Sequence, residues 1–345
     1  MDKKKLLVFG TGKKGLDFLK LIGERGYDDK VAIIKFIDNN QEKWGKTIED
    51  YEIVSPTEVK KLDFDFIIVA STFYQEIREQ LKDEYDISAE KILFSDDFVR
   101  QLNIQNQYEK RYGASYSKRS YTIPNKLVVY TANIGDYDEL EDPQFVDPNI
   151  EYVCFTDDAN FKSDIWQVRL LNPSEIGENA LKVRELKFFP HKLFPEYDMS
   201  IWVDSKYVIK GDIRDYVAKY YQGNKLLFFP HYFRDCIYDE AVRCIQLQKG
   251  DPAIIEQQIT HYRNQGYPEH NGMCEGACIV REHNDIRLQE LMEAWWLEVN
   301  RFSRRDQISL PYVMWKKQYT CDICDLDIER NDYLELKPHK RHETL

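Results

Sequence analysis

Short apolar runs alternate with helical patterns over the first hundred residues, and this alternation restricts the fold more than any other feature. The apolar runs are four to nine residues long and are read as strands; the segments between them carry helical spacing. The strands are expected at residues 4–10, 30–38, 64–71 and 90–94, and the helices at 13–26, 55–62 and 74–85. Strands and helices in this order build a parallel, doubly wound α/β sheet.

The remainder of the 345-residue chain is long enough for a second domain. Residues 101–125 are polar and tyrosine-rich, which predicts a helix tail and a linker. We therefore expect a first domain at 1–100 and a second at 126–345, again α/β. Its predicted strands are 151–158, 199–205, 225–231 and 276–283, and its predicted helices are 212–221, 239–248, 253–266 and 286–302.

The net charge, the apolar runs and the cysteine content indicate which partners and which compartment are expected. The 60 acidic side chains outnumber the 48 basic ones, for a net charge of −12, which argues against coating nucleic acid or an anionic membrane. The apolar run near the N-terminus, "LLVFG", is too short for a signal peptide or a membrane span. Seven cysteines, an odd number scattered along the chain, indicate reduced thiols and a cytoplasmic protein, with Cys321 and Cys324 as ordinary thiols.

A glycine-rich loop follows the first predicted strand. Gly10, Gly12 and Gly15 precede a helix, and Asp38 ends the second strand, where a ribose-binding acid would stand. Two explanations stay open: the loop binds a nucleotide or NAD, or the glycines let the helix pack on the sheet. "FIDNNQEKWGKTIEDYEIVSP" resembles the N-terminal nucleotide-binding domain of bacterial sugar acyltransferases, which implies nucleotide binding without hydride transfer.

Five ordered blocks in the second domain carry a more specific resemblance. They are "VVYTANIGDYDEL", "VCFTDD", "RELKFFPHKLFPEYDMSIWVDSK", "PEHNGMCEGACIVREH" and "WWLEVNRFSRRDQISL". Their order resembles the TOD/MUCI glycosyltransferase-like family over residues 126–318. The resemblance implies a GT-A-like α/β domain that uses a nucleotide-sugar donor.

The blocks also suggest residues that bind the donor. Thr131 ends a strand where a base and ribose would lie, and Asp157 ends the next. Arg184 and Lys187 are one helical turn apart and would hold the diphosphate, with a solvated basic face as the alternative. Near the C-terminus, the resemblance to retaining relatives implies that two further basic residues close over the diphosphate: Lys337 and His339.

Asp204-Ser205-Lys206 follows an apolar strand and poses a question about metal. Most GT-A enzymes carry Asp-x-Asp here and bind a divalent ion, whereas the resembling family carries Asp-Gly-Lys or a similar triplet. Lys206 would therefore stabilise the diphosphate together with neighbouring cations. The alternatives are Mn²⁺ or Mg²⁺ held by Asp204 through one carboxylate and water, or a surface ion pair without function.

Three residues are candidates for the reacting centre. Glu275 precedes the strand "ACIV" and would act as general base or bind the acceptor hydroxyl. Asp306 and Gln307 resemble an Asp-Gln pair that retaining enzymes place beside the donor sugar; a helix cap by Asp306 is the alternative. Arg281, with the two residues after it, is expected in a structural ion network.

Together these features predict a cytoplasmic, hexosyltransferase-like glycosyltransferase. It would transfer a sugar from a nucleotide donor to a glycan or lipid-linked acceptor in bacterial surface polysaccharide synthesis. Two other classes stay open: a degenerate nucleotide-binding scaffold protein, for which Lys206 speaks, and an NAD-dependent sugar-nucleotide oxidoreductase, for which the glycine loop speaks. The residues decide neither retention or inversion of configuration nor the oligomeric state.

Overall fold

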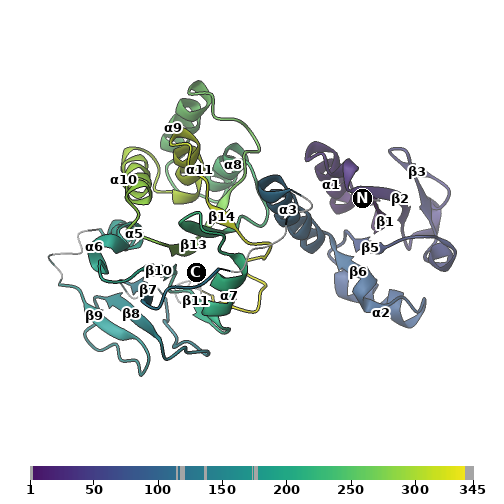
Figure 1. Cartoon of the computed structure of the whole chain (residues 1–345). Coiled ribbons are helices and arrows are strands. Elements are labelled where there is room, and N and C mark those ends of the chain that lie inside the picture. Colours follow the sequence, from purple (N-terminus) through teal and green to yellow (C-terminus); the bar gives the residue numbers. More distant parts are fainter. Residues whose placement is uncertain are drawn as a thin grey trace. The chain divides into compact units, whose positions relative to one another are not determined.

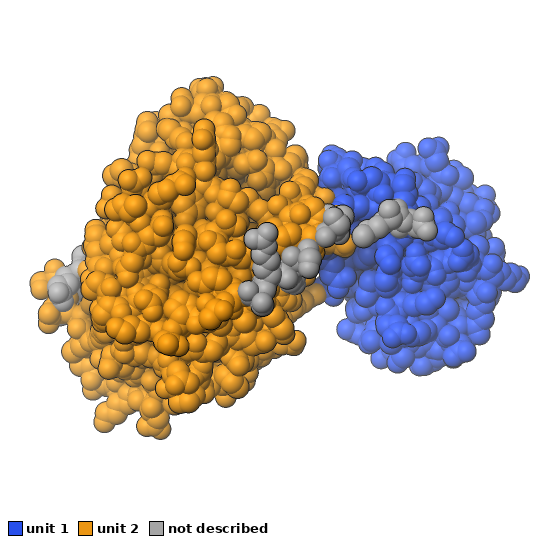
Figure 2. All heavy atoms as spheres, viewed as in Figure 1, with its two compact units in different colours: residues 1–102 blue, residues 103–345 orange. Residues whose placement is uncertain are grey.

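The chain divides into two compact units in a computed structural model that describes residues 3–113, 116, 121–135, 138–172, 174 and 178–338. The first unit is residues 1–102 and the second is residues 103–345, coloured separately in Figure 2. Helix α3, Ser95–Tyr112, crosses this division. Residues 101–112, expected as the start of a linker, are therefore helical, and from Asn103 on they belong to the second unit.

The first unit consists of a six-stranded sheet and the helices that alternate with its strands along the chain (Figure 1). Its strand order is β3-β4-β2-β1-β5-β6, and every pair is parallel except β3–β4. The predicted α/β class is confirmed, but the short β3–β4 pair was not expected. The elements are β1 Lys4–Phe9, α1 Lys13–Glu24, β2 Val31–Ile37, β3 Thr47–Ile48, β4 Tyr51–Val54, β5 Phe66–Val69, α2 Tyr74–Asp83 and β6 Ile92–Phe94.

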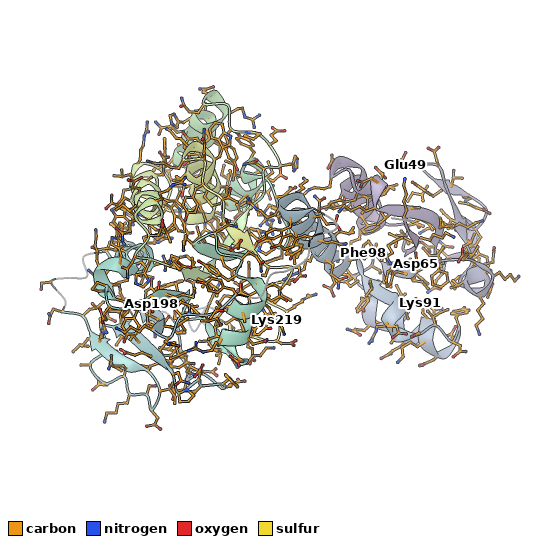
Figure 3. The ribbon with its side chains drawn as sticks, in the orientation of Figure 1. Glu49, Asp65, Lys91, Phe98, Asp198 and Lys219 are labelled. Atoms are coloured by element: carbon orange, nitrogen blue, oxygen red, sulfur yellow. The ribbon has the colours of Figure 1, made fainter. Side chains whose placement is uncertain are left out.

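Aromatic packing holds the start of α3 to this sheet. Phe98, labelled in Figure 3, is buried, and its ring lies 6.3 Å from that of Phe18 and 6.2 Å from that of Phe66. Burying such side chains removes apolar area from water and stabilises the unit.

The second unit is built on a seven-stranded mixed sheet (Figure 1). The order is β14-β12-β13-β10-β7-β8-β9, and β13 is antiparallel to both neighbours while the other pairs are parallel. Its strands are β7 Leu127–Asn133, β8 Ile150–Thr156, β9 Gln167–Leu170, β10 Met199–Val203, β12 Leu226–Pro230, β13 Cys274–Arg281 and β14 Asp322–Ile323, and a separate pair is formed by β11 Tyr207–Ile209 and β15 Leu334–Leu336.

Helices surround this sheet and complete the second unit. Asp212 and Asp251 cap α7 and α9 by accepting hydrogen bonds from the first-turn amides, which explains where these helices begin. On α7, Lys219 pairs with Asp215 one turn earlier (Figure 3). The helices are α5 Asn179–Phe188, α6 Pro190–Leu193, α7 Ile213–Tyr220, α8 Ile237–Gln246, α9 Pro252–Asn264, α10 Ile286–Arg301 and α11 Asp306–Lys316.

The mixed strand directions place the predicted chemistry at one sheet edge. Strand β10 ends at Val203, which lies opposite Cys278 of the antiparallel β13. The residues after β10 therefore lie beside the first residues of β13, and the Asp204 amide donates to the Ala277 carbonyl at 2.8 Å. None of the helices among the described residues is both long enough and apolar enough to cross a membrane.

Candidate active site

A cavity of about 610 Å³ opens at this edge of the second unit. It is lined by the ends of β7 and β10, by residues that follow β7, β10 and β12, by the first residues of β13, by α5, α8 and the start of α11, and by single residues of two loops, Lys249 and Glu329. Seven of the residues predicted from the sequence line this cavity: Arg184, Lys187, Asp204, Lys206, Glu275, Asp306 and Gln307.

Lys187 lies at the centre of the charges in the cavity wall. Its ammonium is buried, 2.8 Å from Asp306 Oδ2 and 3.9 Å from Asp204 Oδ1. Gly276 makes room for it, because a Cβ at that position would stand 2.9 Å from Nζ. Trp202 donates its indole N–H to Asp204 Oδ1 at 2.6 Å, and this hydrogen bond orients the carboxylate that faces Lys187.

Asp306 is an ionised carboxylate at the start of α11. Burial raises its pKa, but the charges of Lys187 and Arg184 outweigh burial, and the pKa lies well below its ordinary value. It is the first residue of α11, whose cap position is occupied by Arg305 without a side-chain cap. Its Oδ1 accepts from the Gln307 amide at 3.1 Å, so Asp306 binds a first-turn amide of α11 as well as Lys187.

Glu275 is a buried carboxyl whose pKa is shifted in the opposite direction from that of Asp306. Burial raises its pKa above the ordinary value, and the Glu240 charge adds to this, although the nearby His231 and Lys206 act against it. Gln307 donates its side-chain amide to Glu275 Oε2 at 2.5 Å. One cavity thus holds a strongly ionised carboxylate and a carboxyl whose proton is retained to higher pH, which is the combination expected of an acid–base site.

His231 and the neighbouring ion pair of Arg234 with Glu240 were not predicted from the sequence. His231 Nε2 lies 3.6 Å from Glu275 Oε1 and 3.5 Å from Glu240 Oε2, and Arg234 Nε pairs with Glu240 at 2.5 Å. The amides of Phe233 and Arg234 donate to His231 Nδ1 at 3.1 and 3.2 Å, which assigns the proton of the neutral ring to Nε2, on the side of the carboxylates.

Helix α3 supports this histidine from behind. Asn103 and Gln107 donate their side-chain amides to the His231 carbonyl at 2.8 and 2.9 Å, and Gln107 accepts from the Met273 amide at 2.8 Å. All of these groups are buried, so removing one partner leaves another unsatisfied.

Lys206 is a further cationic residue that lines the cavity. It is half-buried, its ammonium lies 5.4 Å from the centre of the Tyr207 ring, and no carboxylate among the described residues pairs with it within 4 Å. The preceding Ser205 donates to Asp138 Oδ2 at 2.6 Å.

Asp204 is the predicted protein ligand for Mn²⁺ or Mg²⁺. One oxygen of its single carboxylate already accepts from Trp202 and faces the Lys187 ammonium. In the described part of the chain, no group of three carboxylate, imidazole or thiolate ligands includes Asp204. Mg²⁺ and similar ions can be held by one or two carboxylates together with phosphate and water, so an ion at Asp204 stays a prediction, and we assign no step to a metal there.

Arg281 departs from the expected ion network. It is fully buried and donates at 2.6 Å to both the Lys187 carbonyl and the Tyr130 hydroxyl, while no carboxylate of the described residues pairs with it. Tyr130 donates to the same carbonyl at 3.1 Å. Arg281 therefore fixes the C-terminal turn of α5, from which Lys187 reaches the cavity. The neighbouring Glu282 does form an ion pair, with Lys225.

Of the other four predicted donor residues, three lie outside the cavity lining. Thr131 is buried within β7, and Asp157 is exposed and accepts from the Gly135 amide at 2.9 Å. Lys337 pairs with Glu335 at 3.0 Å, outside the cavity lining. The fourth, His339, lies outside the described residues.

The glycine loop of the first unit is explained in part by packing. A Cβ on Gly10 would stand 2.7 Å from the Ala70 carbonyl oxygen, and one on Gly15 would stand 2.1 Å from the Gly10 oxygen. A Cβ on Gly12 would meet nothing within 4 Å. Asp38 accepts from the Thr11 hydroxyl and pairs with Lys43 at 2.9 Å. Nucleotide binding here stays a prediction.

Comparison with known proteins places this site in a family. The model of the TOD1/MUCI70 glycosyltransferase-like domain family matches residues 70–339, well over half of the chain, and the C2185-like N-terminal family matches residues 2–93. The TOD1/MUCI70 match therefore spans the unit whose α/β fold carries the polar cavity. The chain belongs to the TOD1/MUCI70 glycosyltransferase-like family, as the five ordered blocks predicted.

Individual proteins show the extent of the similarity. A probable hexosyltransferase MUCI70 of Arabidopsis thaliana is 26% identical over 249 residues, which are 63% of this chain. The chain spans 42% of that relative's length. Among solved structures, the bifunctional glycosyltransferase WbbM covers 62% of this chain and 40% of its own, at 10% identity and a TM-score of 0.36. The UDP-D-quinovosamine 4-dehydrogenase of Vibrio fischeri covers 27% of this chain and 76% of its own, at 19% identity and a TM-score of 0.22. Both scores are too low to carry an argument on function.

Proposed function

We propose that this protein transfers a hexose from a nucleotide-sugar donor to a glycan or lipid-linked acceptor. One observation carries the proposal: a single cavity in the glycosyltransferase-like domain combines the ionised Asp306, paired with Lys187, and the buried Glu275, whose pKa is raised. A transferase of this kind must stabilise a departing diphosphate and manage the proton of an acceptor hydroxyl. This cavity offers groups for both tasks.

The leaving nucleoside diphosphate gains negative charge in the transition state. The cations Lys206, Arg184 and Lys187 line the cavity and would stabilise that charge. At about 4 Å and an effective dielectric near 20, each such pair contributes about 4 kcal/mol before desolvation. Asp204, oriented by Trp202, would accept a hydrogen bond from a donor hydroxyl.

Glu275 would take the acceptor proton. A carboxylate with a raised pKa is a stronger base near neutral pH than an ordinary one. Gln307 orients it through one oxygen, and His231 Nε2 approaches the other at 3.6 Å. Asp306, held ionised, would stabilise positive charge that develops at the anomeric carbon.

The first unit would bind a nucleotide at the start of α1, where Gly12 leaves the backbone open. We propose surface polysaccharide synthesis in the bacterial cytoplasm as the setting, supported by seven cysteines that are all unpaired thiols.

A thermal-shift panel tests the proposal against its alternatives. Full-length protein would be heated with nucleotide hexoses, free nucleoside diphosphates and NAD(H), since a ligand that binds the native state raises the melting temperature. We expect a shift with a nucleotide hexose that is lost in Lys206→Ala. A shift with NAD(H) alone would favour the oxidoreductase, and donor binding without turnover would favour the scaffold protein.

A further inference from the structure

We propose that the second unit holds a zinc site formed by Cys236, Asp239 and His270. The sulfur, one carboxylate oxygen and one ring nitrogen of these residues all lie within 4.8 Å of one another. None of the three lines the cavity of the candidate active site. The inference therefore goes beyond the proposed function, and metal binding can be measured whether or not the chain transfers a sugar.

The start of helix α8 supplies two of the ligands. Cys236 occupies the N-cap position and is buried, and Asp239 lies in the first turn and is exposed. Residues three apart on a helix share a side.

The third ligand, His270, is hydrogen-bonded to a buried carboxylate. His270 lies in the loop between α9 and β13, and its Nδ1 is 2.8 Å from Asp235 Oδ1. Because a carboxylate accepts, we assign the proton to Nδ1, which leaves the lone pair on Nε2. Asp235 is buried, with Lys110 at 3.6 Å from its second oxygen. A buried carboxylate behind the imidazole is the outer-shell partner that metal-bound histidines usually have.

The ligand chemistry points to zinc. One sulfur, one nitrogen and one oxygen form the mixed set that Zn²⁺ accepts, whereas Mg²⁺ and Ca²⁺ take oxygen ligands. Bond lengths of about 2.0–2.3 Å in a tetrahedral site bring ligand atoms to about 3.5 Å apart. Asp239 and His270 are exposed and can close that gap of about 1 Å, and water would complete the coordination.

Zinc at this position would connect two loops that lead into the active site. The loop before α8 carries Arg234, and the loop with His270 leads directly into β13 and Glu275. A backbone hydrogen bond already joins them, from the Gly272 amide to the Asp235 carbonyl at 2.8 Å. The ion would thus have a structural role in holding these two active-site segments together.

Zinc titration of the full-length protein tests the site. Metal would be removed with a chelator, Zn²⁺ titrated in competition with a chromophoric chelator, and Co²⁺ used to detect thiolate coordination by absorption. We expect one zinc per chain. His270→Ala and Cys236→Ser should raise the zinc dissociation constant at least about 100-fold, and Asp235→Asn by about 10- to 100-fold.

Controls keep the result interpretable. His191→Ala and Cys154→Ser change the same residue types outside the cluster and should bind zinc as the wild type does. His270 is exposed, so its alanine variant should fold, with a melting temperature in the absence of metal that is lowered only by the loss of the hydrogen bond to Asp235. Failure of the wild type to bind one zinc per chain, or unchanged binding by His270→Ala, would overturn the proposal.

Discussion

Gly276→Ala should reduce activity while leaving stability almost unchanged. A Cβ at this position would stand 2.9 Å from Lys187 Nζ and 3.3 Å from Asp306 Oδ2, whereas ordinary contacts begin at 3.4 Å. The nearest atom is the end of a flexible side chain, so the ammonium would move rather than the strand. Gly276 has no left-handed φ, so alanine fits its backbone.

The size of the effect follows from the Lys187–Asp306 distance of 2.8 Å. At an effective dielectric near 20, a unit pair contributes about 6 kcal/mol at this distance and about 4.4 kcal/mol after a shift of about 1 Å. The difference of about 1.5 kcal/mol corresponds to about a tenfold loss in kcat/KM if the transition state uses this pair. The free energy of unfolding should change by less than about 1 kcal/mol, because glycine-to-alanine replacement also reduces the entropy of the unfolded chain.

Initial rates of nucleoside diphosphate release and urea unfolding would be measured on the same preparation. Gly23→Ala is the control, since a Cβ there meets nothing within 4 Å and its φ is not left-handed. The reasoning is refuted if Gly276→Ala keeps kcat/KM within about twofold of the wild type.

Three further outcomes are expected. Activity should fall as the pH is lowered through the raised pKa of Glu275, because its base form is then lost, and Glu275→Gln should cut turnover about a hundredfold and abolish this acid limb; an unchanged acid limb would exclude Glu275 as the base. Lys206→Ala should weaken nucleoside diphosphate binding about tenfold or more, as measured by calorimetry, and Lys206→Arg should weaken it much less. Equal affinities of the wild type and Lys206→Ala would show that the lysine does not bind the donor. A fragment of residues 95–345 should bind the donor by calorimetry, whereas one of 120–345 should not, because it lacks Asn103 and Gln107; binding by the shorter fragment would show that α3 is dispensable.

The fold could be predicted where elements are long and periodic. Apolar runs such as those of β1, β2 and β10, and the spacing of α10, identified these elements correctly. The strands β3, β11 and β15 are two or three residues long, too short to show a period of two, so they were missed. Helix α11 contains Pro311, which interrupts the helical pattern.

The site could be predicted in part, because strand ends indicate where ligands bind. That rule led to Asp204, whereas Glu275 was predicted from the resemblance to GT-A enzymes. Applied to the strand before His231, the rule would also have found this histidine. The pairing of Lys187 with Asp306 spans 119 positions in the chain, so no local pattern contains it. Arg281 was placed in an ion network from its charged neighbours, but burial against carbonyl and hydroxyl groups decides its role.

Turnover of nucleotide sugars in the absence of acceptor tests the central claim most directly. Full-length protein would be incubated with UDP-, GDP- and dTDP-hexoses, and nucleoside diphosphate release would be followed for the wild type and for Asp306→Asn. The account predicts slow hydrolysis of one donor class by the wild type and at least about a hundredfold less by the variant, because the charge beside the anomeric carbon is gone. Release from no donor, or equal release by both proteins, would contradict it.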